Sequence, residues 1–227
     1  MNNFEQKKQT KVINTIIIIN VILFIPYITY KIFQIPYLYA IVSNFLNLNI
    51  NHPNNFYSIN DGAYWQILSA MFMHGGIFHI IFNMYALYIF GKPLINKWGG
   101  TKFLLFYLTT GILANIASVF IFMQSNNPIS LLGASGAIYA VLLAFVTYYP
   151  DIKLYFFALL PIKAKWAILL FTGIELFSEL TNFNDGIAHI THLFGFLFGF
   201  FYLLFFFRIN AIQKIFFPSE EDKYIIR

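Results

Sequence analysis

The residues of this 227-residue chain best able to do chemistry are a few polar side chains set within long apolar stretches. A serine hydrogen-bonded to a histidine is an activated nucleophile, and an asparagine or a second histidine can donate a hydrogen bond to a developing oxyanion. The sequence contains no cysteine, which excludes thiol nucleophiles, disulfides and thiolate metal sites. The polar residues in question are His74, His79, Asn83, Ser135, Glu175, His189 and His192.

The composition of the chain indicates that water is not its solvent. Hydrophobic residues make up 59% of the sequence and charged residues only 10%, whereas a soluble domain carries about 25% charged residues. A chain of this size cannot bury so much apolar surface in its own core. The composition therefore predicts a membrane protein and excludes intrinsic disorder.

Six apolar stretches have about the length needed to cross a bilayer as a helix, which is roughly 20 residues. They predict an all-α, polytopic bundle of six transmembrane helices, of which the fifth is the shortest. Two shorter apolar runs, 35–46 and 154–162, have the length of interfacial or re-entrant segments. The expected spans are 12–30, 68–90, 103–123, 130–149, 166–180 and 187–207.

The basic residues predict the orientation of these helices. With the amino terminus inside, only Lys31 of the 14 lysines and arginines falls outside, and Lys and Arg accumulate in cytoplasmic loops. We therefore expect a cytoplasmic tail at 1–11, a membrane domain at 12–208 and a cytoplasmic tail at 209–227, which includes the charged residues 218–222. The first span has no small-residue cleavage site and reads as a retained anchor. Because this topology explains the net positive charge, we expect no nucleic-acid partner. We expect a multi-pass protein of a bacterial plasma (inner) membrane.

Three polar residues are expected at the same depth in the membrane. In this topology the second, fourth and sixth spans run from outside to inside, and His74, Ser135 and His192 each lie five or six residues into their span. At 1.5 Å per residue, this is roughly 8 Å below the outer surface. His79 and Asn83 are four residues apart on one helix face, one to two turns deeper, or nearer the same layer if that helix begins later.

Small residues predict close contact between the fourth and sixth spans. Gly136 begins one series of small residues at a spacing of four, and Gly195 and Gly199 form another, a pattern that lets membrane helices touch backbone to backbone. Ser135 precedes Gly136, and His192 shares a face with Gly195. The contact would bring the serine hydroxyl within reach of the imidazole.

Other interpretations of the same residues are open at this point. A membrane serine commonly bonds its own helix backbone, and a histidine commonly fills a satisfied polar position. A metal site built from the membrane histidines lacks the His-Glu-x-x-His spacing and a nearby carboxylate in sequence, so we expect no metal or cofactor. We expect Glu175 and Glu179 to line a wet cavity or to snorkel rather than to take part in catalysis.

Taken in order, the polar motifs resemble those of the rhomboid intramembrane serine proteases. The second span is similar to the Trp-Arg start and His-x4-His-x3-Asn signature of that family, the fourth to its Gly-x-Ser-Gly motif, and the sixth to its His-x-x-Gly-x-x-x-Gly motif. The match covers nearly the whole six-helix region. The matching residues are Trp65, His74, His79 and Asn83, then Gly133, Ser135, Gly136 and Tyr139, and finally His192, Gly195 and Gly199.

The resemblance implies a proteolytic site with particular roles. Ser135 would be the nucleophile and His192 the general base, as a dyad with no third acid. His79, Asn83 and the Ser135 backbone amide would form the oxyanion hole, with His74 as a supporting residue, and Tyr139 would pack on the His192 ring. The glycines Gly133, Gly136, Gly195 and Gly199 would serve helix packing. The substrates would be transmembrane segments of other proteins in the lipid bilayer, and the fifth helix would gate their entry.

Three positions depart from the family pattern. Gln66 stands where the family often has Arg, which puts the pinning of the first outside loop in question. Asn96 stands where it often has Glu. Ala188-His189 superficially resembles the Ala-His pair that marks the base, but that register would put His192 where Gly is expected and leave Gly195 without a role. We therefore assign the base to His192 and expect His189 to be a satisfied helix-end residue.

Two rival functions are distinguishable from the sequence. A rhomboid-like pseudoenzyme that binds membrane clients would typically lack the Ser or the His, and both are present here. A transporter or channel would need polar residues that continue to the inner side, whereas these cluster in the outer half.

Overall fold

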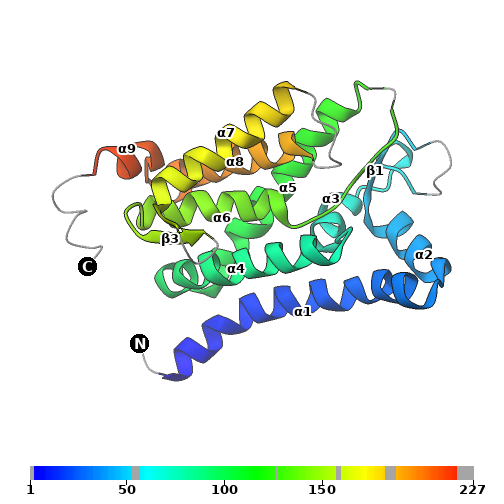
Figure 1. Ribbon diagram of the computed structural model, residues 1–227, viewed down its shortest axis with the longest axis horizontal. Coiled ribbons are helices and arrows are strands. Elements are labelled where there is room, and N and C mark those ends of the chain that lie inside the picture. Colours follow the sequence, from blue (N-terminus) through cyan, green and yellow to red (C-terminus); the bar gives the residue numbers. More distant parts are fainter. Residues whose placement is uncertain (1–2, 53–56, 126, 157–159, 182–187, 219–227) are drawn as a thin grey trace.

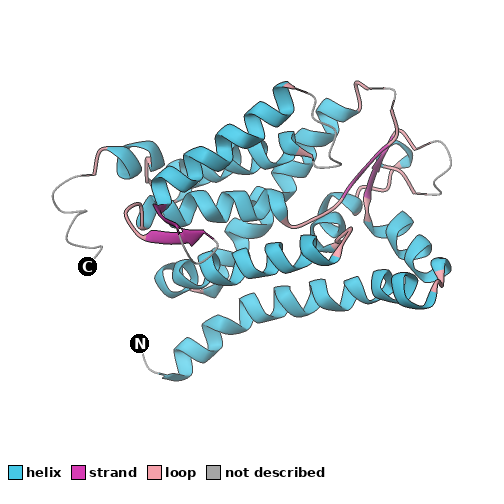
Figure 2. Cartoon of the chain, viewed as in Figure 1, coloured by secondary structure: helices cyan, strands magenta, loops and turns pink. Residues whose placement is uncertain are grey.

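The computed structural model describes residues 3–52, 57–125, 127–156, 160–181 and 188–218. The main helices run side by side along the longest direction of the molecule (Figure 1). Two small pairs of strands lie at opposite ends of this bundle (Figure 2). The charged residues expected in the tail at 218–222 lie largely outside the described residues.

Within these residues, four helices are long and apolar enough to cross a membrane. They are α1 (Asn3–Phe33), in which the candidate span is Lys11–Phe33, α4 (Ile77–Trp98), α5 (Gly100–Phe122) and α8 (His189–Phe206). The helix α6 (Ser135–Tyr148) is apolar but shorter, and α7 (Ala164–Leu180) has 17 residues. The chain is therefore a mostly helical, multi-pass membrane protein.

The expected helical architecture is confirmed in its main part, and short strands connect some of the helices. β1 (Leu48–Ile50) pairs antiparallel with β2 (Ile129–Leu131), and β3 (Lys153–Phe156) pairs with β4 (Leu160–Lys163). The run 154–162, expected as an interfacial or re-entrant piece, thus supplies most of the β3–β4 pair. The run 35–46 does form a separate helix, α2 (Pro36–Leu46).

The second expected span begins later than its hydropathy suggests. Its first residues form the short helix α3 (Gln66–Ser69) and the 3-10 turn η2 (Ala70–Phe72), and α4 starts only at Ile77. Gly75 and Gly76 explain the break, because each glycine costs about 1 kcal/mol relative to alanine inside a helix, and Gly76 is extended with φ of −175°. His74 consequently lies in a loop, and His79 lies in the first turn of α4.

The expected positions of Ser135 and His192 within their helices also differ from those in the structure. Ser135 is the first residue of α6, because residues 129–131 form β2 instead of helix. His192 lies one turn into α8. Both residues therefore sit at the ends of their helices, next to the loops on one side of the bundle.

The helix α6 occupies the centre of the bundle. It packs against α4, α5, α7 and α8, and most of its residues are buried alanine, glycine or β-branched side chains. Small side chains leave room for neighbouring helices to approach closely. The position of Ser135 is thus fixed by surrounding helices rather than by a surface loop.

The carboxyl-terminal segment expected as a cytoplasmic tail is partly packed. It contains α9 (Ala211–Phe216), whose Ala211 and Ile215 are buried in the main core. This helix lies toward the same end of the molecule as the amino-terminal end of α1 (Figure 1).

The first long connection is tied to the bundle through Gln66, at the position where the family often has Arg. Gln66 is fully buried. Its Oε1 accepts a bond from the Asn49 backbone N at 3.0 Å, and its Nε2 donates to the carbonyls of Asn44 and Tyr57, each at 3.1 Å. The neutral glutamine therefore pins the loop without a charge. Asn96, the other departure, is exposed on α4.

Candidate active site

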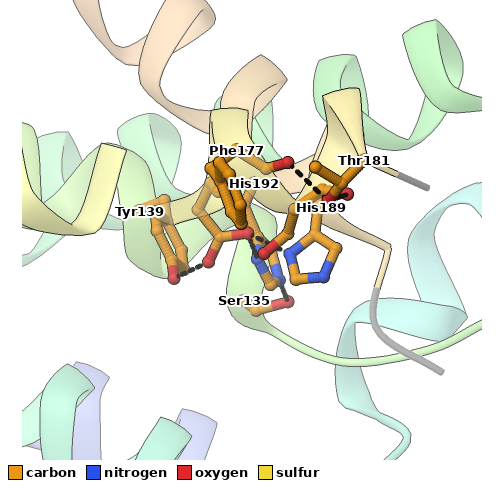
Figure 3. Close-up of polar contacts among 8 residues, drawn as sticks. Ser135, Tyr139, Phe177, Thr181, His189 and His192 are labelled. Carbon is orange, nitrogen blue, oxygen red and sulfur yellow. Dashed lines mark hydrogen bonds and ion pairs between the residues drawn. The ribbon is translucent and has the colours of Figure 1, made fainter. Parts of the chain in front are cut away.

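Ser135 and His192 are in direct contact. The Ser135 Oγ lies 2.8 Å from the His192 Nε2, and Figure 3 shows the two side chains pointing toward each other from α6 and α8. Ser135 is half-buried, and His192 is 8% exposed. This is the geometry in which a histidine can take the proton of a serine hydroxyl.

Glycines bring these two helices together. A Cβ added to Gly195 would lie 2.1 Å from the Gly136 carbonyl oxygen, and one added to Gly199 would lie 2.9 Å from the Cβ of Ala140. Only backbone fits between α6 and α8 at Gly195. Since Ser135 and His192 flank this point, the close approach of the backbones positions the pair.

Aromatic packing fixes the His192 ring. The Tyr139 ring stacks on it with centroids 4.4 Å apart and an angle of 7° between planes. Phe196 packs edge-on against Tyr139 at 4.9 Å. The imidazole therefore has little freedom to rotate away from Ser135.

His79 lies beside the same serine across Gly133. Gly133 has φ of +123°, and a Cβ there would lie 2.8 Å from His79 Nε2 and 3.6 Å from Ser135 Oγ. Glycine at this position leaves the space between the two side chains open. His74, which is 2% exposed, packs edge-on against the His79 ring with centroids 4.9 Å apart.

Asn83 follows His79 by four residues on α4, so both side chains project from one face of that helix. Its side chain is 7% exposed. Within the described part of the chain, the buried Asn83 Nδ2 has no hydrogen-bond acceptor. A buried amide donor without a partner is costly, and it is a feature of sites that bind an oxygen of a substrate.

Glu175 of α7 lies beside the His192 ring at Nδ1, the nitrogen that does not contact Ser135. Its side chain is buried, with the residue 6% exposed. The Tyr139 hydroxyl donates to Glu175 Oε1, and Glu175 Oε2 lies 2.6 Å from His189 Nδ1 and 3.0 Å from His192 Nδ1. The expectation that Glu175 lines a wet cavity or snorkels is therefore wrong. His189 is the buried residue expected at the helix end, and it bonds this carboxylate.

The contact between His192 and Glu175 is close but not collinear. The separation of 3.0 Å is within ion-pair range, yet the ring N–H direction does not meet hydrogen-bond geometry, and His192 Nδ1 has no other acceptor among the described residues. The separation therefore places the imidazole in ionic contact with the carboxylate, and no other described acceptor competes for His192 Nδ1.

Glu175, His189 and His192 also form the one group of potential metal ligands found in the described residues, with ligand atoms within 4.8 Å of one another. Ligands about 2.1 Å from a tetrahedral metal are about 3.4 Å apart. The Oε2-to-Nδ1 separations of 2.6 and 3.0 Å are shorter. They are the separations of groups that share protons.

A serine hydrogen-bonded to a histidine, at helix ends within an apolar bundle, defines the class of membrane serine hydrolases. The family description "Rhomboid domain" matches residues 61–209. The chain belongs to the rhomboid family of serine proteases. The matched residues include all of α4, α5, α6, α7 and α8 and every site residue described above.

Several characterised relatives share this region. The chain is 40% identical to rhomboid protease GluP of Bacillus subtilis over 84 residues, which cover 37% of this chain and 16% of the relative. It is 34% identical to RHOMBOID-like protein 6, mitochondrial, of Arabidopsis thaliana over 145 residues, or 62% of this chain and 44% of the relative. It is 30% identical to the human presenilin-associated rhomboid-like protein, mitochondrial, over 139 residues, or 60% of this chain and 36% of the relative. The matches thus span less than half the length of these relatives.

Proposed function

We propose that this protein is an intramembrane serine endopeptidase that cleaves the transmembrane segments of other membrane proteins. The observation that carries the proposal is the 2.8 Å contact between Ser135 Oγ and His192 Nε2. Family membership supports it, since the family implies membrane-protein substrates. The reaction needs only side chains and water.

In the proposed reaction, Ser135 Oγ attacks the scissile carbonyl carbon while His192 Nε2 takes the hydroxyl proton. The carbon–nitrogen bond then breaks, and the imidazolium gives its proton to the leaving amine. A water molecule, deprotonated by the same imidazole, then attacks the acyl carbon; the bond to Ser135 Oγ breaks, and the imidazolium returns its proton to that oxygen. The two steps replace one difficult hydrolysis with two easier ones.

Three donors are assigned to the oxyanion of the tetrahedral intermediate. They are the Asn83 Nδ2, the His79 Nε2 and the Ser135 backbone amide. The Asn83 amide supports this role because it is buried without a partner in the described chain. Ser135 supports it because the first amides of a helix have no intrahelical acceptor and lie at the positive end of the helix dipole.

The proposed topology has six spans, with α6 and α7 as the fourth and fifth and with both termini cytoplasmic. The β3–β4 pair and the segments around α9 then lie inside, and β1, β2 and Ser135 lie toward the outside. Water reaches the dyad from that side. The relatives are bacterial and mitochondrial, and we assign this protein to a bacterial plasma membrane.

The chemistry restricts the substrate. A peptide bond in an intact helix is shielded by side chains and hydrogen bonds, so a cleavable segment must unwind near the bond. We therefore expect helix-destabilising residues beside the cut, and the resemblance to the rhomboid proteases implies a small residue at the cut itself.

The test is cleavage of a single-span reporter by the reconstituted full-length chain. Ser135→Ala and His192→Ala should reduce turnover to background, a loss on the order of 10³-fold or more. Ser43→Ala and His52→Ala are matched controls in the first loop region and should cleave at the wild-type rate. His189→Ala should keep measurable turnover.

A fluorophosphonate probe gives an independent readout of the nucleophile. Labelling that is present in the wild type and absent in Ser135→Ala supports the assignment even for a poor reporter. If the folded wild type neither cleaves nor labels, the protease proposal is wrong and a client-binding role takes its place.

A further inference from the structure

We propose that Glu175 completes the catalytic pair as a positioning residue, which makes the site a Ser135–His192–Glu175 array instead of a simple dyad. The inference rests on the proposed function and extends it to a residue on a third helix. Glu175 would hold the His192 imidazole in the orientation and tautomer that accept the serine proton.

The geometry requires a particular tautomer of His192. For Nε2 to accept the Ser135 hydroxyl proton at 2.8 Å, the ring proton must sit on Nδ1. That nitrogen faces Glu175 Oε2 at 3.0 Å. A carboxylate is an acceptor only, so its presence favours the protonated Nδ1 and leaves the Nε2 lone pair directed at Ser135.

The carboxylate is itself held in place. Its Oε1 accepts from Tyr139, and its Oε2 accepts from His189 Nδ1 at 2.6 Å. Tyr139 of α6 and His189 of α8 thus both bond one buried carboxylate supplied by α7, and His192 Nδ1 lies within ion-pair distance of it. A carboxylate fixed in this way can stabilise the imidazolium that forms when His192 takes the proton.

The groups around His192 all come from four helices. Tyr139 covers one face of its ring, His189 lies one turn away on α8, and Glu175 approaches from α7. On α4, His79 lies near Ser135 across Gly133. Of these groups, Glu175 is the acid, so it is the one that favours positive charge on His192.

The same contact links α7 to the reaction centre. The face of α7 away from the site is exposed, including Leu169, Ile174 and Phe177. Glu175 is the α7 side chain that bonds both Tyr139 of α6 and His189 of α8. A displacement of α7 that moved this carboxylate would release the His192 ring from its orientation.

The test is Glu175→Gln in the reconstituted full-length protein. Gln has nearly the same shape, but its amide can donate to Nδ1 and favour the tautomer in which Nε2 carries the proton. We expect kcat to fall 10²-fold to 10⁴-fold with KM changed less than threefold, by analogy with removal of the charge in a serine-protease triad. The rate of fluorophosphonate labelling should fall in parallel, since it reports the nucleophile without a protein substrate.

A pH profile separates positioning from simple packing. The charge of the carboxylate acts on the imidazole beside it, so removing that charge should change the acid limb of kcat/KM, whereas a loss of packing alone should leave it unchanged. Glu175→Asp retains the charge and should recover part of kcat. Glu179→Gln, the same substitution one turn along α7, should leave kcat and the pH profile at wild-type values.

The outcomes distinguish this inference from the proposed function. If Ser135→Ala abolishes cleavage but Glu175→Gln keeps kcat and the acid limb unchanged, the dyad acts alone and the inference is wrong. It is also wrong if Glu175→Gln only lowers the melting temperature and leaves the kcat and pH profile of the folded fraction intact. If Ser135→Ala retains full cleavage, the proposed function itself fails.

Discussion

A methyl group on Gly195 would lie 2.1 Å from the carbonyl oxygen of Gly136, well inside van der Waals contact. Gly136 follows Ser135 directly, and His192 lies one turn before Gly195 in α8. The point of closest helix approach is therefore also the point at which the serine and histidine meet. Helix packing and the contact between Ser135 and His192 therefore depend on the same two glycines.

Gly195→Ala should destabilise the protein and separate the dyad, because the Gly136 backbone cannot move aside as a flexible side chain could. Overpacking of this kind costs about 1–3 kcal/mol or more. Thermal unfolding in detergent and reporter cleavage measure the two effects. Gly173→Ala, on α7 with nothing within 4 Å of its added Cβ, should keep both stability and activity. Equal behaviour of the two variants would contradict the role of the glycine seam.

Gly133→Ala should lower activity more than stability. Its φ of +123° disfavours a side chain, and the added Cβ would press on His79 Nε2 at 2.8 Å. Gly62 provides the control, because its φ is +90° and its added Cβ meets nothing within 4 Å. Both variants carry a backbone cost of about 1–2 kcal/mol, but only Gly133→Ala should reduce kcat, by about tenfold or more. A comparable loss of kcat in Gly62→Ala would show that strain alone is responsible.

Asn83→Ala should lower activity and leave the stability of the fold nearly unchanged, whereas a core substitution lowers stability. The Asn83 Nδ2 is buried and has no acceptor within the described chain, so its removal forfeits no protein hydrogen bond there. Loss of one oxyanion donor reduces kcat by about 10²-fold to 10³-fold. Steady-state kinetics and a melting curve on the same sample measure kcat and the melting temperature. Asn96→Ala, at an exposed position on the same helix, is the control. A large drop in melting temperature without loss of kcat would assign Asn83 to the fold.

Gln66→Glu should loosen the first outside loop. The substitution keeps the acceptor for Asn49 but replaces a donor with an oxygen that faces the carbonyls of Asn44 and Tyr57. An unsatisfied or opposed buried group costs about 1–3 kcal/mol. Hydrogen exchange at the Asn49 amide should rise at least tenfold. In Gln124→Glu, where an exposed amide bonds one carbonyl, exchange at Asn49 should not change.

Much of the arrangement at the site could be predicted from short-range patterns. The spacing of Gly136 with Ala140, and of Gly195 with Gly199, predicts two helix faces that can pack in close contact. Because Ser135 and His192 lie beside these faces, their proximity follows. Each pattern lies within a single helix, where the 3.6-residue repeat determines the helix face on which each residue lies.

The start of α4 and the strands could not be predicted in the same way. Hydropathy averages over a window, so the apolar residues of α3 and η2 appear continuous with α4 across Gly75 and Gly76. β1 and β2 contain three residues each and are separated by almost eighty positions. Their pairing is a long-range contact with no local periodicity.

The role of Glu175 depended on contacts between three helices. As a lone acid in an apolar run it is a functional candidate, but which of its neighbours it reaches depends on how α7 rotates against α6 and α8. The exposed apolar face of α7 now explains that rotation, because it turns Glu175 inward. The presence of Gln66 where the family often has Arg was visible in the sequence, whereas the hydrogen bonds of the Gln66 side chain were not.

The pairing of β1 with β2 gives the protein a mechanical linkage. β2 ends at Leu131, and only residues 132–134 separate it from Ser135 at the start of α6. β1, in turn, belongs to the loop that Gln66 holds. A displacement of that loop would therefore move β2 through its pairing with β1, and with it the short segment that leads into Ser135.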